Sequence, residues 1–410
     1  MRSHYKQLGN YIKQVDERNT KLAVDTLLGV SIEKVFMPSI ANTIGTDMST
    51  YKIVKRNQFA YGPVTSRNGD KISIALQDQY NEVIVSQAYT PFEIIDTKAL
   101  LPEYLMMWFR RPEFDRYARF MSHGSAREIF EWDEMCKVTL PVPHPDKQKE
   151  IVKEYNAIVN RINLNNQLIQ KLEETAQAVY KQWFVDFEFP DENGQPYKSS
   201  GGEMVFKKEL EKEVPKKWTQ KQVQEIAKVV DSLHTTPDYA SQGLPMVRVT
   251  DVNSGFLDLA NTMLVDNETF EKFSKNHKSK KGDIVVSRVG ATFGEFSYAH
   301  TDEKFCLGQN TAVIIPTILD SKLLYTALTT SDIRNQIEAK AVGSAYSTLS
   351  LQDIKELTLT LPDEDFELIT HALAEKFDIL FINRSLCCQE NWSLIRMQRL
   401  LLSKLATVEN

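Results

Sequence analysis

Hydrophobic residues recur at intervals of three and four positions along two long stretches of the sequence, residues 146–187 and 363–408. Such spacing predicts two helices, of about 38 and about 40 residues, each with an apolar seam that must be buried against another helix. The seam residues singled out are Ile158, Ile162, Asn165, Ile169 and Leu172 in the first stretch and Leu380, Cys387 and Leu394 in the second.

Three polar residues interrupt these seams. Asn165 lies in the first, and Arg384 and Asn391 lie at companion positions of the second. Polar groups inside a helix–helix seam often fix the register of the pair, so we interpret them as register contacts rather than active-site groups. The two helices are expected to pair with each other in antiparallel fashion. The alternative is that each helix packs on its own globular domain.

A second pattern occurs twice along the chain. One copy begins at Gly124-Ser125-Ala126 and the other at Gly343-Ser344-Ala345, and 19 residues later each ends at a proline, Pro143 or Pro362. Apolar residues alternate before each proline, which predicts a strand with one buried face. A long helical stretch follows each copy, so the chain is an internal repeat with pseudo-two-fold symmetry.

The predicted fold class is α+β, with two mixed α/β globular parts separated by two long antiparallel coiled-coil helices. Short strands are expected at residues 52–54, 82–85, 245–249 and 283–286, and short helices near 102–109 and 321–329. The expected organisation is a globular part over 1–145, the first long helix over 146–187, a turn-rich linker over 188–215, a second globular part over 216–362 and the second long helix over 363–408.

Composition narrows the class of protein. Hydrophobic residues make up 42% and charged residues 25% of the 410 residues, as in ordinary globular proteins. The sequence contains no run of 18 apolar residues, so no membrane span is expected. Residues 1–6 lack the apolar core of a signal peptide, and a cytoplasmic protein is expected. The net charge of −6 means that DNA binding would need local basic patches or a basic partner.

Catalytic and metal-binding motifs are absent from the sequence. It has no Gly-rich phosphate-binding loop and no Gly-x-Ser-x-Gly nucleophile elbow. It also lacks the Asn-Pro-Pro or Asp-Pro-Pro core of the tetrapeptide found in enzymes that methylate amino groups. Its four cysteines and seven histidines lack metal-ligand spacing. Glu338-Ala339-Lys340 matches only the tail of a nuclease motif, without the upstream Pro-Asp. We therefore expect no catalytic residue and no metal site in this chain.

Basic and polar loops are the candidate binding residues. Clustered lysine and arginine side chains suit contacts with DNA phosphates, although a solvated face is the ordinary alternative. Polar loop side chains suit contacts with base edges, and the alternative is an ordinary polar turn. The candidates are Thr65, Ser66, Arg67, Asn68 and Arg127 in the first globular part, and His234, Thr235, Thr236, Lys278, Lys280, Lys281, Arg288 and Tyr346 in the second.

Several motifs, in order along the chain, resemble those of the specificity (S) subunit of type I restriction-modification systems. They are Trp183-Phe184-Val185-Asp186-Phe187-Glu188, Tyr197-Lys198-Ser199-Ser200-Gly201-Gly202, Val214-Pro215-Lys216-Lys217-Trp218 and Gly282-Asp283-Ile284-Val285-Val286-Ser287-Arg288-Val289-Gly290. The duplicated repeat-and-helix unit also fits that family. The first half departs from the pattern, because residues 57–61 stand where the second half has 282–286. Contacts therefore cannot be transferred from one half to the other.

The resemblance implies two target recognition domains that each read one half of a split double-stranded DNA target. It implies two methyltransferase subunits and motor nuclease (restriction) subunits as partners. S-adenosylmethionine, ATP and Mg²⁺ would belong to those partners, with no cofactor in this chain. A helix of 38 residues is about 57 Å long. Two domains held apart by such a helix would be far enough apart to contact successive turns of the DNA major groove. Two other hypotheses stay open: a coiled-coil adaptor whose globular halves bind protein, and an enzyme with an unrecognised site.

Overall fold

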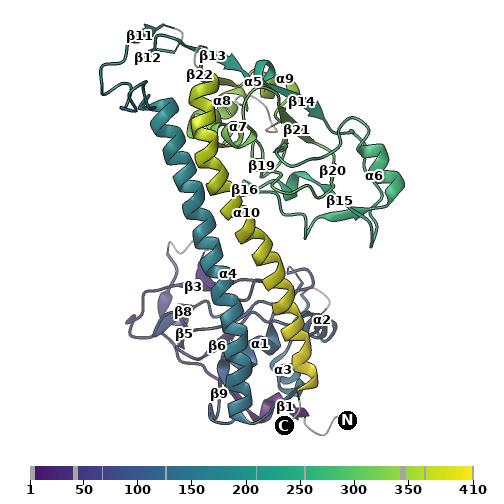
Figure 1. Cartoon of the computed structure of the whole chain (residues 1–410). Helices are drawn as coiled ribbons and strands as arrows, with labels where there is room; N and C mark the ends of the chain where they lie inside the picture. Colours follow the sequence, from purple (N-terminus) through teal and green to yellow (C-terminus); the bar gives the residue numbers. More distant parts are fainter. Residues whose placement is uncertain are drawn as a thin grey trace. The chain divides into compact units, whose positions relative to one another are not determined.

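The computed structural model describes residues 5–39, 45–66, 68–124, 127–208, 210–253, 255–341, 348–363 and 366–408 (Figure 1). The chain divides into two compact units. Unit 1 comprises residues 1–162 and 393–410, and unit 2 comprises residues 163–392. Each long helix contributes one segment to each unit. The two units are described separately below.

Unit 1 is built on a four-stranded antiparallel sheet with the strand order β2-β9-β6-β7. Phe59 on β6 stacks on Phe92 of β9, with ring centroids 4.9 Å apart, and Phe109 packs edge-on against both rings. Three further antiparallel pairs surround this sheet: β1·β10, β3·β4 and β5·β8. The bounds are β1 Tyr5–Gln7, β2 Ile12–Gln14, β3 Leu28–Val30, β4 Phe36–Pro38, β5 Lys52–Lys55, β6 Phe59–Tyr61, β7 Ile74–Leu76, β8 Glu82–Val85, β9 Thr90–Ile94, β10 Thr139–Pro141, α1 Pro102–Phe109, α2 Pro112–Phe120 and α3 Trp132–Lys137.

Unit 2 is built on a five-stranded sheet with the order β14-β21-β18-β19-β16. A second sheet, β17-β15-β20, and the pairs β13·β22 and β11·β12 complete its strands. The bounds are β11 Met204–Lys207, β12 Lys212–Pro215, β13 Trp218–Gln222, β14 Ala227–Asp231, β15 Leu244–Val247, β16 Gly255–Phe256, β17 Met263–Val265, β18 Ile284–Ser287, β19 Phe296–Tyr298, β20 Cys306–Leu307, β21 Thr311–Pro316, β22 Thr358–Pro362, α5 Val223–Ile226, α6 Asn267–Phe273, α7 Ser321–Leu328, α8 Ser331–Ala341 and α9 Leu351–Lys355.

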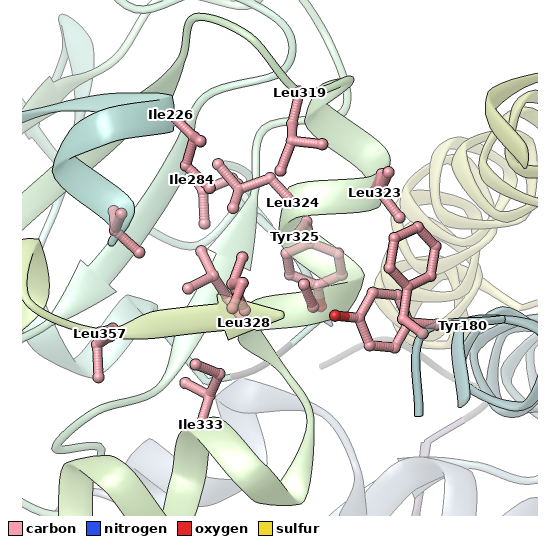
Figure 2. Packing of buried hydrophobic residues seen from close by; sticks show 14 of the residues in the cluster. Tyr180, Ile226, Ile284, Leu319, Leu323, Leu324, Tyr325, Leu328, Ile333 and Leu357 are labelled. Atoms are coloured by element: carbon pink, nitrogen blue, oxygen red, sulfur yellow. The ribbon is translucent and has the colours of Figure 1, made fainter. Parts of the chain in front are cut away.

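The main core of unit 2 lies between its larger sheet and α7. Ile284 on β18 packs in one cluster with Leu324 and Leu328 of α7, and Leu357, just before β22, belongs to the same cluster (Figure 2). Tyr180, the last residue of the long helix α4 (Pro145–Tyr180), joins this core, and its burial raises the pKa of its phenol. The long helix is therefore fastened to unit 2 by aromatic burial.

The internal repeat predicted from the sequence is visible in the topology of both units. The order β2-β9-β6-β7 in unit 1 matches β14-β21-β18-β19 in unit 2. Equivalent backbone hydrogen bonds recur as well: the Leu8 N–H donates to Val138 O at 2.7 Å, and the Val223 N–H donates to Leu357 O at 2.9 Å. Each repeat ends in the expected strand, β10 or β22, with one buried apolar face.

Two long helices are present and pack together within each unit. They are α4, Pro145–Tyr180, and α10, Phe366–Lys404 (teal and yellow in Figure 1). Their lengths are 36 and 39 residues, close to those predicted. In unit 1, Tyr155 of α4 accepts a hydrogen bond from Gln398 of α10. In unit 2, Asn165 of α4 contacts Asn391 of α10.

The sequence motifs after α4 form an aromatic cluster in unit 2. A π-helical turn, Lys181–Val185, brings Phe184 onto Trp218, and Phe187 and Phe189 pack on the same indole with centroid distances of 5.4 and 5.2 Å. Tyr197 stacks on Phe189. A β-carbon at Gly202 would come within 2.4 Å of the Tyr197 ring, which explains the glycine in that motif. These motifs anchor the connection between the halves.

Candidate functional site

The loop between β6 and β7 carries the first group of candidate residues in unit 1. Thr65 is buried, at 1% exposure, and both its N–H and its hydroxyl donate to Glu128 O. Ser66 is exposed, and half-buried Asn68 donates its side-chain amide to Val64 O. Arg67 lies outside the described residues. Thr65 therefore fixes the loop, while Ser66 and Asn68 are the described candidates that remain at its surface.

The structure brings Arg127 close to this loop. Val64 forms an antiparallel bridge with Ile129, and the Phe130 N–H donates to Pro63 O at 2.8 Å. The segment that contains Arg127 thus runs beside the loop, and the Arg127 side chain is exposed. Arg119, from α2, forms an ion pair with Glu128 of the same segment. The candidate loop and Arg127, 59 positions after Asn68 in the sequence, therefore belong to one region of unit 1.

An apolar hollow of about 550 Å³ lies beside the same loop. It is lined by the β3–β4 hairpin on one side and by Pro63, Val64 and Asn68 on the other. Lys34, at the hairpin turn, is buried and donates to Phe109 O and to Asp115 Oδ2 at 2.5 and 2.8 Å. Burial lowers the pKa of Lys34, although its hydrogen bond with Asp115 acts in the opposite direction. This hairpin was not among the predicted strands.

In unit 2, His234 and Arg288 meet at a carboxylate that sequence reasoning missed. Arg288 Nη1 lies 2.7 Å from Asp231 Oδ1, and His234 Nε2 lies 2.8 Å from Asp231 Oδ2. Arg288 Nε also donates to Leu349 O. The Arg288 side chain is 12% exposed, and its guanidinium forms an ion pair with Asp231. Thr235 and Thr236 follow as exposed residues, and Tyr346 lies outside the described residues.

The lysine cluster of unit 2 is not part of that group. Lys278, Lys280 and Lys281 are exposed and precede β18, whereas Arg288 follows it. Six residues lie between Lys281 and Arg288, and the four of them that form β18 span about 13 Å. Buried Asp283 holds the lysine segment, because it accepts from the Lys280 N–H at 2.8 Å and lies 2.7 Å from His277 Nε2. The two predicted contacts of this half therefore lie at opposite ends of β18.

The predicted seam residues occupy inward positions of the long helices. In unit 2, Asn165 is buried and donates to Asn391 Oδ1 at 3.0 Å and to Glu390 Oε2 at 2.9 Å, while Asn391 donates to Asn166. Cys387 is buried in the same unit. The other seam residues, Ile169, Leu172 and Leu380 in unit 2 and Ile158, Ile162 and Leu394 in unit 1, are half-buried.

The described residues offer neither a membrane-spanning helix nor a metal-binding cluster. Within that part of the chain, no helix carries the long apolar stretch needed to cross a bilayer. In the same residues, no three histidine, cysteine, aspartate or glutamate side chains are grouped so as to hold a metal ion.

The family model for the type I restriction modification DNA specificity domain matches this chain twice, over residues 34–174 and 215–378. The chain belongs to this type I specificity family. Each match covers most of one globular part and extends into the long helix that follows it, so the family unit is the same unit that the internal repeat defines.

Curated relatives agree with the assignment to the specificity family. The MjaIX specificity subunit of a type I restriction enzyme from Methanocaldococcus jannaschii is 24% identical over 297 residues, which is 71% of this chain and 65% of that protein. The HindI specificity subunit from Haemophilus influenzae is 27% identical over 141 residues, 33% of this chain and 30% of that protein. The matched regions thus span less than two thirds of these relatives. Such relatives are the specificity subunits, not the catalytic subunits, of their systems.

A solved specificity subunit shares the fold. The crystal structure of the S subunit of a type I restriction-modification system from M. genitalium matches with a TM-score of 0.54 at 14% identity. The match covers 99% of this chain and 96% of that one. This chain therefore shares the overall fold of that solved S subunit.

Proposed function

We propose that this chain is the DNA sequence-specificity subunit of a type I restriction-modification complex and that it reads a bipartite target. The target recognition domains would be residues 1–145 and 216–362, the spacer helices 146–187 and 363–408, and the linker 188–215. One observation carries the proposal: the family model matches twice, while the candidate loops of the two units differ in their side chains and in their place, between β6 and β7 in unit 1 and after β14 in unit 2. One scaffold with two different loop sets suits two different half-sites.

Within this proposal, Ser66, Asn68 and Arg127 contact one half-site, and His234, Thr235 and Thr236 contact the other. Lys278, Lys280 and Lys281 contact phosphates near the second half-site, where exposed lysines position the protein without reading sequence. Thr65 is buried and holds its loop in place through its hydrogen bonds to Glu128 O. Arg288 and Asp231 orient His234, so replacing Arg288 with alanine should weaken binding of the assembled complex. Unchanged affinity would remove Arg288 from the recognition site.

The proposed partners are two methyltransferase subunits and restriction subunits, which bring S-adenosylmethionine, ATP and Mg²⁺. This chain supplies no catalytic group, and the complex acts on host and invading DNA in the cytoplasm. Large exposed apolar side chains on the long helices in unit 2 support docking there, because such side chains commonly mark protein interfaces. They are Leu164, Leu168, Ile379, Ile382 and Leu386.

The docking proposal is tested by replacing Ile382 and Leu386 together with glutamate in the full-length chain. We expect co-purification with the methyltransferase subunit to be lost, because two charges would be buried in an apolar interface. Leu22→Glu, an equally exposed apolar position in unit 1, is the matched control and should leave co-purification unchanged. Retention of the methyltransferase by the double variant would refute the docking surface.

The function itself is tested by co-expressing the chain with a methyltransferase subunit and sequencing the host DNA for methylated adenines. We expect one split motif that disappears when this chain is deleted. Exchanging Ser66 and Asn68 for alanine should alter one half of the motif and leave the other half intact. Methylation that persists unchanged without the chain would favour the adaptor hypothesis.

A further inference from the structure

Arg384 is a charged residue buried where three elements of unit 2 meet. Its side chain on α10 is 4% exposed. Its guanidinium carbon lies 4.2 Å from the centroid of the Phe256 ring, on strand β16 of the five-stranded sheet. Its Nη1 forms an ion pair with Glu173 of α4. One side chain therefore contacts both long helices and the edge of the sheet.

Neighbouring contacts fasten α10 to the globular part of unit 2. Phe381, one turn before Arg384, lies 5.4 Å from the Phe256 ring and 5.1 Å from the Tyr298 ring. Ser385 Oγ lies 2.8 Å from Nδ1 of His300, beyond the end of β19. Arg384 adds the link to α4. A β-carbon at Gly255 would come within 3.4 Å of Arg384 Nη2, so the strand approaches the guanidinium closely.

A buried arginine is a costly way to fill this space. Burial lowers the pKa of Arg384 to about 10, so the group still carries its charge at neutral pH. Apolar residues of similar volume often replace a buried ion pair without loss of stability. An ion pair combined with a cation–π contact, however, accepts fewer geometries than apolar packing does. Buried polar groups in helix pairs are best attested as devices that specify one arrangement.

We propose that Arg384 is a positioning residue: by joining Glu173 to Phe256 it fixes the orientation of the five-stranded sheet on the two long helices. Through that orientation it restricts the spacing between half-sites that the complex accepts. The inference rests on the proposed function. It assigns Arg384 no contact with DNA, so its loss should change spacing without changing the bases that are read.

The test is Arg384→Met in the full-length chain, co-expressed with the methyltransferase subunit, followed by mapping of methylated adenines. Methionine keeps a long side chain but removes both charged contacts. We expect both half-sites to be unchanged. We also expect methylation at spacers one base pair longer or shorter to rise at least about tenfold, equivalent to about 1.4 kcal/mol of lost discrimination. Phe256→Leu, which keeps the ion pair, should cause a smaller rise.

Arg111→Met is the matched control. Arg111 is 6% exposed, and its guanidinium carbon also lies 4.2 Å from an aromatic centroid, that of Trp108. It forms an ion pair with Glu113 at the turn between α1 and α2, within unit 1. Its loss should lower the melting temperature without relaxing the spacing. The control separates positioning from a general loss of stability.

Strict spacing in Arg384→Met, together with a fall in melting temperature like that of Arg111→Met, would overturn the inference. If Arg384→Met fails to assemble with the methyltransferase subunit, Phe256→Leu becomes the test. Unchanged spacing in that variant would likewise overturn the inference. A wild-type chain that directs no split motif would instead refute the proposed function, so the two failures are distinguishable.

Discussion

The two units fasten the long helices by different chemistry. In unit 1 the buried group is the neutral amide of Gln148 on α4, which accepts from the Leu101 N–H and donates to Ala99 O and Pro143 O. In unit 2 the buried groups include, besides the neutral amides of Asn165 and Asn391, the charged Arg384 and the titratable His300. Two units with the same strand order therefore hold their segments of the long helices through different polar contacts. A neutral junction is insensitive to pH, whereas a titratable one is not.

The largest effect is expected from Gln148→Leu, which tests the neutral junction. The change removes the partner of the half-buried Leu101 N–H and Ala99 carbonyl and of the buried Pro143 carbonyl, and we expect a loss of about 4 kcal/mol in the free energy of unfolding. Gln177→Leu is the matched control on the same helix in unit 2. Gln177 is half-buried and donates to Thr326 O and Thr329 Oγ1, so its loss should cost about 1 kcal/mol. Urea denaturation measures both, and equal losses would contradict the comparison.

Unit 1 also contains buried charges away from the long helices, and one of them is Lys34 in the β3–β4 hairpin. Asp115→Ala leaves Lys34 buried without its counter-ion, and we expect a loss of about 3 kcal/mol. The double variant Lys34→Met/Asp115→Ala should lose less than Asp115→Ala alone, because no unpaired charge remains. Urea denaturation of the three variants tests this order. A double variant as unstable as the single one would show that the ion pair is not the cause.

Acid should weaken unit 2 through His300. Burial, helped by the nearby positive charge of Lys281 and opposed by Asp258, lowers the pKa of His300 from 6.5 to about 4. The unfolded chain therefore binds the proton first, and stability is lost as the pH falls from 6.5 towards 4. At pH 5 this amounts to about 2 kcal/mol.

The measurement compares urea denaturation of the wild type and His300→Phe at pH 7.5 and pH 5. Phenylalanine does not titrate and can keep the stack on Phe256, where the ring centroids are 4.9 Å apart. Trp392, 5.4 Å from the imidazole, is a local fluorescence probe. We expect the variant to lose about 2 kcal/mol less than the wild type on acidification. Equal losses would mean that His300 is not the acid-sensitive group.

The sequence predicted the long helices and the repeat because both are written in local periodicity. Apolar residues at intervals of three and four positions specify α4 and α10. Alternating apolar and polar residues specify β10 and β22. Arg384 was visible as a polar residue at a seam position. Its contact with Phe256, 128 positions earlier, was not, because periodicity carries no information on which distant strand a helix meets.

The candidate site was less predictable for the same reason. The Thr65 loop was recognised as polar, but its burial depends on Glu128, 63 residues away. Asp231 has no local signal, since its role comes from Arg288, 57 residues later. Gln148 lies among charged residues at the start of a helix and looks like a surface residue in sequence. Long-range pairing decided each of these cases.

The smallest effect on stability is expected in the loops, where the two units differ most. Ser66→Ala and Thr235→Ala replace exposed side chains of unit 1 and unit 2, so each should change the free energy of unfolding by less than about 0.5 kcal/mol. If these hydroxyls read bases, each variant should lose about 1 kcal/mol of discrimination at one half-site only. Mapping of methylated adenines measures this for each half separately. If one substitution changed both halves of the motif, the two units would not read DNA independently. The difference between their loops would then not explain two separate half-sites.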